Sequence, residues 1–230
     1  MSRPDGRADD QLRPVSFEVD VQPSPAGSVL VSFGETRVIV SASVEEGRPR
    51  WKPAGGWLTG EYAMLPGATT DRARRERRGP SGRSKEIERL LGRSLRMAVD
   101  LDAMPEATIT IDADVLVADG GTRTAAITGG WVALARALRS IDGEDALVRQ
   151  LAAVSVGVVD GACVLDLPYV EDRDADVDMN VVAAADGTIV EVQGTAEGAP
   201  FDRAQHDRML DLALAGIDEL CVLQRTAVDA

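Results

Sequence analysis

Apolar and polar residues alternate along much of the first fifty positions, which is the spacing of strands with one buried face. The alternation is broken at "PSPAG" and "GET", where proline and glycine favour turns. The pattern therefore predicts an antiparallel meander of three strands, over residues 15–21, 28–33 and 37–44.

The same alternation returns in three later stretches. The segment "ATITIDADVLVA" predicts a strand over residues 107–118. Two hairpins are predicted over residues 151–170 and 179–198, because Asp160-Gly161 and Asp186-Gly187 are favoured pairs at tight hairpin turns.

Apolar residues at helical spacing predict three helices. The first covers "GRSKEIERLLGRSLRMAVDL", with an apolar face and an opposite basic face made of Lys85, Arg89, Arg93 and Arg96. The others cover residues 122–139 and about 202–216. Residues 48–82 have little periodicity and are predicted as one long loop, and loops of that length are functional or disordered. Strands interleaved with helices indicate a layered α+β or α/β fold.

Length and composition suit a chain that folds by itself. It has 230 residues, of which 44% are hydrophobic, and this is enough for the core of one large domain or two small ones. The sequence shows no leader-like apolar segment and no run long enough to span a membrane, so we expect an intracellular, cytoplasmic protein with no membrane partner.

Cysteine and histidine exclude several kinds of chemistry. Cys163 and Cys221 are isolated, so we expect no zinc site and no disulfide. The single histidine, His206, lies in a predicted helix with no serine or cysteine motif near it. Histidine-dependent nucleophilic catalysis is therefore not expected, and an enzyme would depend on carboxylates, arginines and metal ions.

The net charge of −13 is unevenly distributed. Residues 72–96 contain ten basic and three acidic side chains, a charge of +7 that leaves −20 for the rest of the chain. A basic island in an acidic protein can direct a polyanion to one place, although the part before Gly79 could equally be a solvated charge run.

The segment "DVLVADGGTRTAAITGG" places a glycine pair where a strand meets a helix. Gly120 and Gly121 allow a tight turn, and the turn brings Thr122 and Arg123 to the first turn of the helix. Free amides, a hydroxyl and a guanidinium suit a phosphate there, although most such turns bind nothing. Arg83 also follows a glycine at a predicted helix start.

A second cluster lies in "LPYVEDRDADVDMNVV". It has five carboxylates in eight positions: Glu171, Asp172, Asp174, Asp176 and Asp178. Oxygen ligands of this kind suit Mg²⁺ or Mn²⁺. A solvated acidic loop is the plainer interpretation of the cluster taken by itself.

At this point the motifs carry a family resemblance. The stretches "RPDGRADDQLRPVSFE", "GWLTGEYAMLP", "TITIDADVLVADGGTRTAAITGG" and "DLPYVEDRDADVDMNVV", in this order, resemble the bacterial ribonuclease PH family over nearly the whole chain. The resemblance implies a phosphate-dependent 3′-to-5′ exoribonuclease and nucleotidyltransferase that trims tRNA precursors. It implies an α+β fold like that of ribosomal protein S5 domain 2, as a single domain over residues 1–230. It also implies a homohexamer, a hexameric ring built as a trimer of dimers.

The resemblance also assigns roles to residues. Arg83, Gly121, Thr122 and Arg123 match the positions that hold the attacking phosphate, which is the co-substrate. Asp172 and Asp178 match two aspartates that bind the divalent metal, Mg²⁺ or Mn²⁺, so the implied catalytic residues are Arg83, Arg123, Asp172 and Asp178. A basic loop at about residues 67–82 matches an arginine-rich segment that contacts tRNA and helps join subunits; its arginines are Arg72, Arg74, Arg75, Arg77 and Arg78.

The sequence departs from the family pattern in three places. The basic loop and the linker "RSIDGEDALVRQL" are shorter, and the tail "LCVLQRTAVDA" is only loosely similar. Two alternatives remain open: a non-catalytic RNA-binding subunit of a ring, and an unrelated enzyme that uses phosphate or a nucleotide at the glycine turn.

Overall fold

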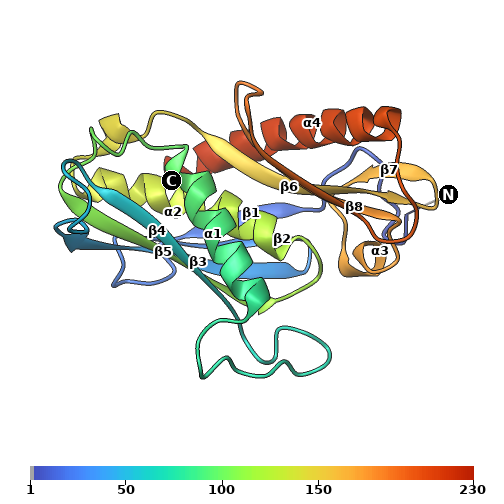
Figure 1. Cartoon of the computed structure of the whole chain (residues 1–230), viewed down its shortest axis with the longest axis horizontal. Coiled ribbons are helices and arrows are strands. Elements are labelled where there is room, and N and C mark those ends of the chain that lie inside the picture. The colour runs from blue at the N-terminus through green and yellow to red at the C-terminus, as the bar shows by residue number, and fades with distance from the viewer. Residues whose placement is uncertain (1–2) are drawn as a thin grey trace.

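The structure, a computed structural model, describes residues 3–230 and builds them into two β-sheets with helices packed around them (Figure 1). The first sheet has the order β1-β2-β3-β5-β4. Its antiparallel part contains the predicted meander, β1 (Val15–Val19), β2 (Gly27–Phe33) and β3 (Thr36–Glu46), followed by β5 (Ala107–Val117). The predicted strands are confirmed, with ends shifted by one or two residues.

The prediction of an unbroken loop over residues 48–82 is wrong. Residues Trp57–Met64 form β4, which pairs in parallel with β5 at the edge of the first sheet. Only Leu58 and Tyr62 of this strand are buried. Two buried positions among eight leave almost no alternation to detect, so the strand depends on its pairing with β5 and on α1, which packs over it.

The second sheet has the order β7-β6-β8-β9. It consists of the two predicted antiparallel hairpins: β6 (Leu151–Val159) with β7 (Ala162–Leu165), and β8 (Val177–Ala184) with β9 (Ile189–Ala196). The first was predicted to reach residue 170, but β7 ends at Leu165 and residues 169 and 170 belong to a short helix. Asp160 and Gly161 have φ values of 50° and 80°. Positive φ at both central residues is what a type I′ turn requires.

Helix α2 (Thr122–Ser140) lies at the centre and joins the two sheets. It packs against β2 and β3 of the first sheet and against β6 of the second. This position explains why its apolar residues are not confined to one face and why small residues let the strands approach. Helix α1 (Gly82–Arg96) covers β4, and its buried residues lie on the predicted apolar face.

The last helix is longer than predicted. α4 spans Arg203–Val228 and packs on β6, β7 and β8, whereas the sequence predicted an end near residue 216. Leu220, Cys221 and Gln224 continue its buried face. Gln224 donates from Nε2 to the carbonyl oxygens of Thr128 and Leu151, a polar contact that a search for apolar spacing passes over. Two short elements complete the chain, α3 (Tyr169–Asp172) and the 3₁₀ turn η1 (Glu144–Ala146).

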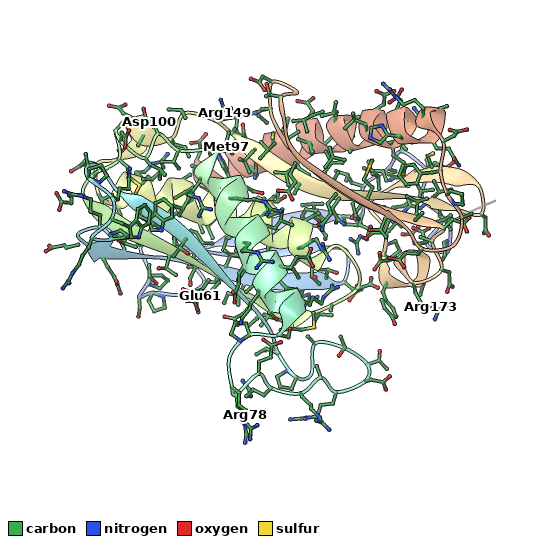
Figure 2. The ribbon with its side chains drawn as sticks, in the orientation of Figure 1. Glu61, Arg78, Met97, Asp100, Arg149 and Arg173 are labelled. Carbon is green, nitrogen blue, oxygen red and sulfur yellow. The ribbon has the colours of Figure 1, made fainter. Side chains whose placement is uncertain are left out.

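The connection from β4 to α1, residues 65–81, projects away from both sheets (Figure 1). The beginning of the connection is anchored, since the Ala118 amide donates to the Ala68 carbonyl over 2.8 Å. Arg78 lies on its outer part with its side chain directed away from the body of the molecule (Figure 2).

Three smaller predictions concern single residues and membrane spans. Cys163 and Cys221 are both free thiols, and Cys221 is fully buried. His206 lies on α4, where its ring contacts the carboxylate of Asp207. None of the helices in residues 3–230 has the length and hydrophobicity of a membrane span.

Two backbone segments approach each other closely beside the start of α2. Gly120 has φ of 73°, and a Cβ atom there would lie 2.4 Å from the Leu167 carbonyl oxygen and 2.9 Å from the Tyr169 nitrogen. Glycine is therefore required twice, for its backbone conformation and for the space. The turn that starts α2 and the segment that starts α3 touch backbone to backbone at this point.

We expect Gly120→Ala to destabilise the protein by about 3 kcal/mol or more, because it adds a backbone clash to the strain of a positive φ. Gly161→Ala is the matched control. Gly161 has φ of 80°, and a Cβ atom there would have nothing within 4 Å, so only the strain of about 1 kcal/mol applies. Urea unfolding measures both, and equal losses would contradict a steric role for Gly120.

Candidate active site

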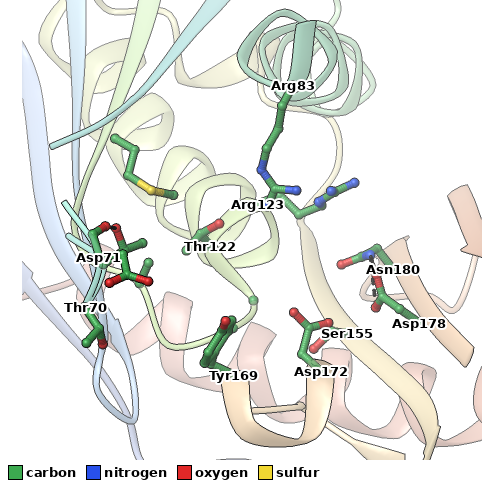
Figure 3. Close-up of a pocket in the computed structure, with 15 residues that line it drawn as sticks. Thr70, Asp71, Arg83, Thr122, Arg123, Ser155, Tyr169, Asp172, Asp178 and Asn180 are labelled. Atoms are coloured by element: carbon green, nitrogen blue, oxygen red, sulfur yellow. Dashed lines mark hydrogen bonds between the residues drawn. The ribbon is translucent and has the colours of Figure 1, made fainter. Parts of the chain in front are cut away.

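A cavity of about 460 Å³ opens where the start of α1, the start of α2, α3 and β8 converge (Figure 3). Its walls include all six residues assigned by resemblance to phosphate and metal: Arg83, Gly121, Thr122, Arg123, Asp172 and Asp178. The structure thus brings together residues that are up to 95 positions apart in the sequence.

The N-terminus of α2 faces the cavity without a capping side chain. Its N-cap is Gly121, which offers none, whereas the N-cap of α1, Ser81, accepts a hydrogen bond from the Ser84 amide. The first amides of a helix have no partner within the helix, and the helix dipole adds positive potential there. The start of α2 is therefore suited to bind an anion.

The hydroxyl of Thr122 is oriented by a residue that the sequence did not single out. Tyr62 of β4 donates its phenolic proton toward Thr122 Oγ1 over 2.9 Å. Burial raises the pKa of Tyr62, so it stays protonated and acts as the donor. The proton of Thr122 is then free to point to a ligand in the cavity.

The carbonyl side of the glycine turn is fixed from below by Arg13. Its Nη2 donates to Asp166 Oδ1 over 2.7 Å and its Nη1 to the Asp119 carbonyl over 2.5 Å, and both charged side chains are almost fully buried. Thr36 Oγ1 also donates to the Gly120 carbonyl over 2.6 Å. Because the carbonyls of Asp119 and Gly120 accept these hydrogen bonds, the amides of the turn are directed to the opposite side, toward the cavity.

Arg83 and Arg123 reach the cavity from two different helices. Within residues 3–230, the Arg83 guanidinium makes no hydrogen bond or ion pair, and it extends from α1 toward Arg123 (Figure 3). Arg123 is held by its Nη1, which lies 3.2 Å from Glu86 Oε1 and 3.0 Å from Gln193 Oε1. Its Nε and Nη2 make no hydrogen bond with a described residue and can serve as donors to a ligand.

Asp172 and Asp178 form the opposite wall. Burial raises the pKa of Asp172, although the charges of Arg83 and Arg123 act against this. Burial, and then the charge of Asp172, raise the pKa of Asp178 to about 6. Asn180 Nδ2 donates to Asp178 Oδ2 over 3.3 Å.

The two carboxylates fit a hard divalent cation. The charge of Asp172 disfavours ionisation of Asp178, so a cation held by the two would relieve the costs of burial and repulsion. No group of three or more His, Cys, Asp or Glu residues suited to a metal exists among residues 3–230. Mg²⁺ is usually held by one or two carboxylates, and water and phosphate oxygens take its remaining coordination positions.

The other members of the acidic cluster lie elsewhere. Glu171 is buried in an ion pair with Arg3 of 2.6 Å, and Asp174 is exposed beside Arg173. Asp176 accepts the amides of Glu197 and Gly198 at its carbonyl and does not line the cavity. The segment is neither one five-carboxylate site nor a solvated loop, because α3 and β8 give each side chain a different direction.

The arginines of the basic loop do not line the cavity. Five are exposed, and none makes an ion pair with a residue of the described chain: Arg72, Arg74, Arg75, Arg77 and Arg78. The loop instead contributes Thr69, Thr70 and Asp71 to the cavity wall. The arginines thus lie beyond the mouth of the cavity.

Several other lining residues had no signal in the sequence. Ser155 of β6 and Asn180 of β8 lie inside apolar strands, and Tyr169 follows a proline at the start of α3. Each is a lone polar or aromatic residue in its segment, so only the packing of β6, β8 and α3 around α2 brings it to the site.

We expect Asp178→Asn to stabilise the protein against thermal unfolding above pH 6 when divalent cations are chelated. The native pKa lies above the unfolded value of 3.8, so ionisation opposes folding. This cost is absent below pH 4, grows between pH 4 and 6 and is complete above pH 6, where it is on the order of 1–3 kcal/mol. Melting temperatures at pH 4 to 8 measure it; a variant less stable than the wild type at pH 8 would contradict the prediction.

Comparison with protein families identifies two matching segments. Residues 11–139 match domain 1 of the 3′ exoribonuclease family and residues 150–216 match domain 2. The first segment contains Arg83 and the start of α2, and the second contains Asp172 and Asp178. The cavity therefore lies between the two matched segments.

Curated relatives match along nearly the whole chain. Ribonuclease PH of Mycobacterium sp. strain KMS is 58% identical, covering 99% of this chain and 92% of its own length. Ribonuclease PH of Saccharopolyspora erythraea is 55% identical, covering 100% and 96%. Both alignments cover every residue of the cavity wall.

Solved structures share the fold at lower identity. Rice Rrp46 has a TM-score of 0.82 at 21% identity, covering 98% of this chain and all of its own. An Archaeoglobus fulgidus exosome chain has a TM-score of 0.80 at 24% identity, covering 95% and 91%. The expected α+β fold, like that of ribosomal protein S5 domain 2, is confirmed. By its fold, its two matched segments and its full-length relatives, the chain belongs to the 3′ exoribonuclease family of the ribonuclease PH type.

Proposed function

We propose that this chain is a phosphate-dependent 3′-to-5′ exoribonuclease that trims tRNA precursors and other RNA 3′ ends and releases nucleoside diphosphates. The observation that supports this most strongly is the composition of the cavity. The uncapped N-terminus of α2 and the arginines Arg83 and Arg123 face two half-buried aspartates across one space. Such a space suits two phosphates and a cation.

The reaction uses phosphate as the nucleophile. Orthophosphate, held by Arg83, Arg123 and the start of α2, forms a bond from one of its oxygens to the phosphorus that joins the last two nucleotides. The bond from that phosphorus to the 3′ oxygen of the penultimate nucleotide breaks. The 3′ oxygen receives a proton, and the terminal nucleotide leaves as a nucleoside diphosphate.

Positioning and charge account for the catalysis. The arginines and the amides of α2 hold the attacking phosphate in line with the scissile bond, and this removes most of the entropic cost of the encounter. Asp172 and Asp178 would hold Mg²⁺ or Mn²⁺. When bound there, the cation supplies positive charge beside the scissile phosphate and the departing oxygen. One phosphorus–oxygen bond replaces another, so the reaction is reversible. Excess nucleoside diphosphate would therefore drive the addition of nucleotides to the RNA 3′ end.

The basic loop is proposed to hold RNA outside the cavity. Its five arginines are exposed, and Arg78, on the outer part of the loop, projects past the body of the chain (Figure 2). A homohexamer in the cytoplasm would bring several such loops together. Their combined charge would attract RNA despite the net charge of −13 on each chain.

We expect purified protein with Mg²⁺ and a tRNA carrying a short 3′ extension to release nucleoside diphosphates only when phosphate is added. Chromatography of the products distinguishes the alternatives. Monophosphates without phosphate would indicate a hydrolase, and no release in either condition would indicate an RNA-binding subunit.

We expect replacement of Arg74, Arg75 and Arg77 by alanine to weaken tRNA binding and to reduce its salt dependence. Each lost phosphate contact removes about 0.7 from the slope of log affinity against log salt for a single strand. A control variant replaces three exposed arginines of α4, Arg203, Arg208 and Arg225. Filter binding from 50 to 300 mM salt, with light scattering to verify the assembly, measures both; an unchanged slope in the loop variant would contradict the assignment.

A further inference from the structure

Arg123 is held from behind by two side chains that do not line the cavity. Glu86 of α1 and Gln193 of β9 both accept from its Nη1, at 3.2 Å and 3.0 Å. Gln193 Nε2 in turn donates to Glu86 Oε1 over 3.0 Å. The three side chains form a closed triangle in which each member contacts the other two.

The triangle crosses the space between the two halves of the molecule. Glu86 and Arg123 lie in residues 11–139 and Gln193 lies in residues 150–216, the two segments matched separately to the family. α1 and β9 have almost no direct packing, so side chains bridge the gap. The contact therefore fixes a distance that backbone packing leaves free.

The far end of the bridge leads to the carboxylate wall. Gln193 is paired directly with Asn180 on β8, and Asn180 Nδ2 lies 3.3 Å from Asp178. Residues directly opposite on antiparallel strands share a face of the sheet. Gln193 thus links Arg123 to the strand that carries Asp178.

The local charges agree with this arrangement. The hydrogen bond from Gln193, together with the charges of Arg123 and Arg83, lowers the pKa of Glu86. Glu86 is therefore ionised when Arg123 is charged. Glu86 and Gln193 both accept from Nη1, and together these two contacts fix the plane of the Arg123 guanidinium. Its Nε and Nη2 remain available to a ligand.

We propose that Glu86 and Gln193 are positioning residues: they hold the Arg123 guanidinium in the orientation that binds orthophosphate and keep it at a fixed separation from Asp178. This inference rests on the proposed function, because orthophosphate is taken as the ligand of Arg123. It predicts that the bridge affects phosphate binding far more than the rate of the bound complex.

The chain offers a matched control for this bridge. About two turns along α1 from Glu86, Arg93 makes an ion pair with Glu191 of β9, two residues from Gln193. This second bridge joins the same two elements on the same face but does not contact Arg123. A purely structural role of the α1–β9 contacts would make the two bridges equivalent.

The experiment compares KM for phosphate, kcat and KM for RNA in Glu86→Ala, Glu86→Gln, Gln193→Leu and Glu191→Ala, with Arg123→Ala as the reference for complete loss. We expect Glu86→Ala and Gln193→Leu to raise KM for phosphate about 3- to 10-fold, the effect of losing one ordinary hydrogen bond, with kcat changed less than 2-fold. Glu86→Gln keeps an acceptor oxygen at the same place and should restore KM to within 2-fold. Glu191→Ala should leave it unchanged.

Three results would overturn the proposal. One is an unchanged KM for phosphate in both Glu86→Ala and Gln193→Leu, and another is an equal rise in Glu191→Ala. The third is an equal rise of KM for phosphate in Glu86→Gln and Glu86→Ala, which would mean that the negative charge of Glu86, and not its hydrogen bond, carries the effect. Gln193→Leu tests the bridge from its other end if Glu86→Ala fails to fold.

Calorimetric titration with orthophosphate alone separates this proposal from the proposed function. A wild-type protein that binds orthophosphate, with weaker binding in Glu86→Ala, but releases no diphosphate from RNA would retain the positioning role and reject the exoribonuclease. A phosphorolytic wild type whose Glu86→Ala and Gln193→Leu variants bind orthophosphate normally would retain the enzyme and reject the positioning role.

Discussion

The buried ion pair between Arg13 and Asp166 is the interaction on which the rest of the site depends. Both side chains are almost completely removed from solvent, and Arg13 also donates to the carbonyl of Asp119 at the glycine turn. A buried charge that loses its partner costs about 3–5 kcal/mol, so the pair is strongly constrained. It joins the N-terminal segment, the end of β7 and the start of α2. The amides that we propose to bind phosphate therefore have a fixed direction before any ligand arrives.

The site is built from opposite charges that the protein keeps apart. Positive potential comes from α1 and α2, and negative potential comes from α3 and β8. Burial makes ionisation of Asp178 costly, and the divalent cation that we propose for this site would relieve that cost. The arginines opposite limit the cost for Asp172 but do not remove it. In the proposed reaction this separation of charge would let phosphate and metal bind side by side without a catalytic histidine.

Local sequence patterns predicted the elements whose burial is periodic. The meander, both hairpins and the start of α2 follow from alternation and turn chemistry, and each is present. β4 was missed because only Leu58 and Tyr62 are buried. The predicted end of α4 fell at Gly216, a residue that disfavours helices but is packed closely against Leu165 here, and the helix continues past it. Both depend on contacts with distant segments, which no local pattern records.

The candidate site shows the same division. The glycine turn and the acidic cluster stood out locally, and the family resemblance selected Asp172 and Asp178 from five carboxylates. Glu86 and Gln193 gave no signal, since they lie 37 and 70 residues from Arg123 and are ordinary surface types. Tyr62 was hidden in a strand that was itself missed. Roles that arise from convergence of distant segments required the three-dimensional structure.

The most direct test of the account follows the phosphorus atom itself. Unlabelled RNA with a 3′ extension is incubated with the protein, Mg²⁺ and orthophosphate labelled with ³²P. The account predicts that the label enters the β-phosphate of the released nucleoside diphosphate, because orthophosphate is the nucleophile. RNA shortened while all the label remains in orthophosphate would contradict it.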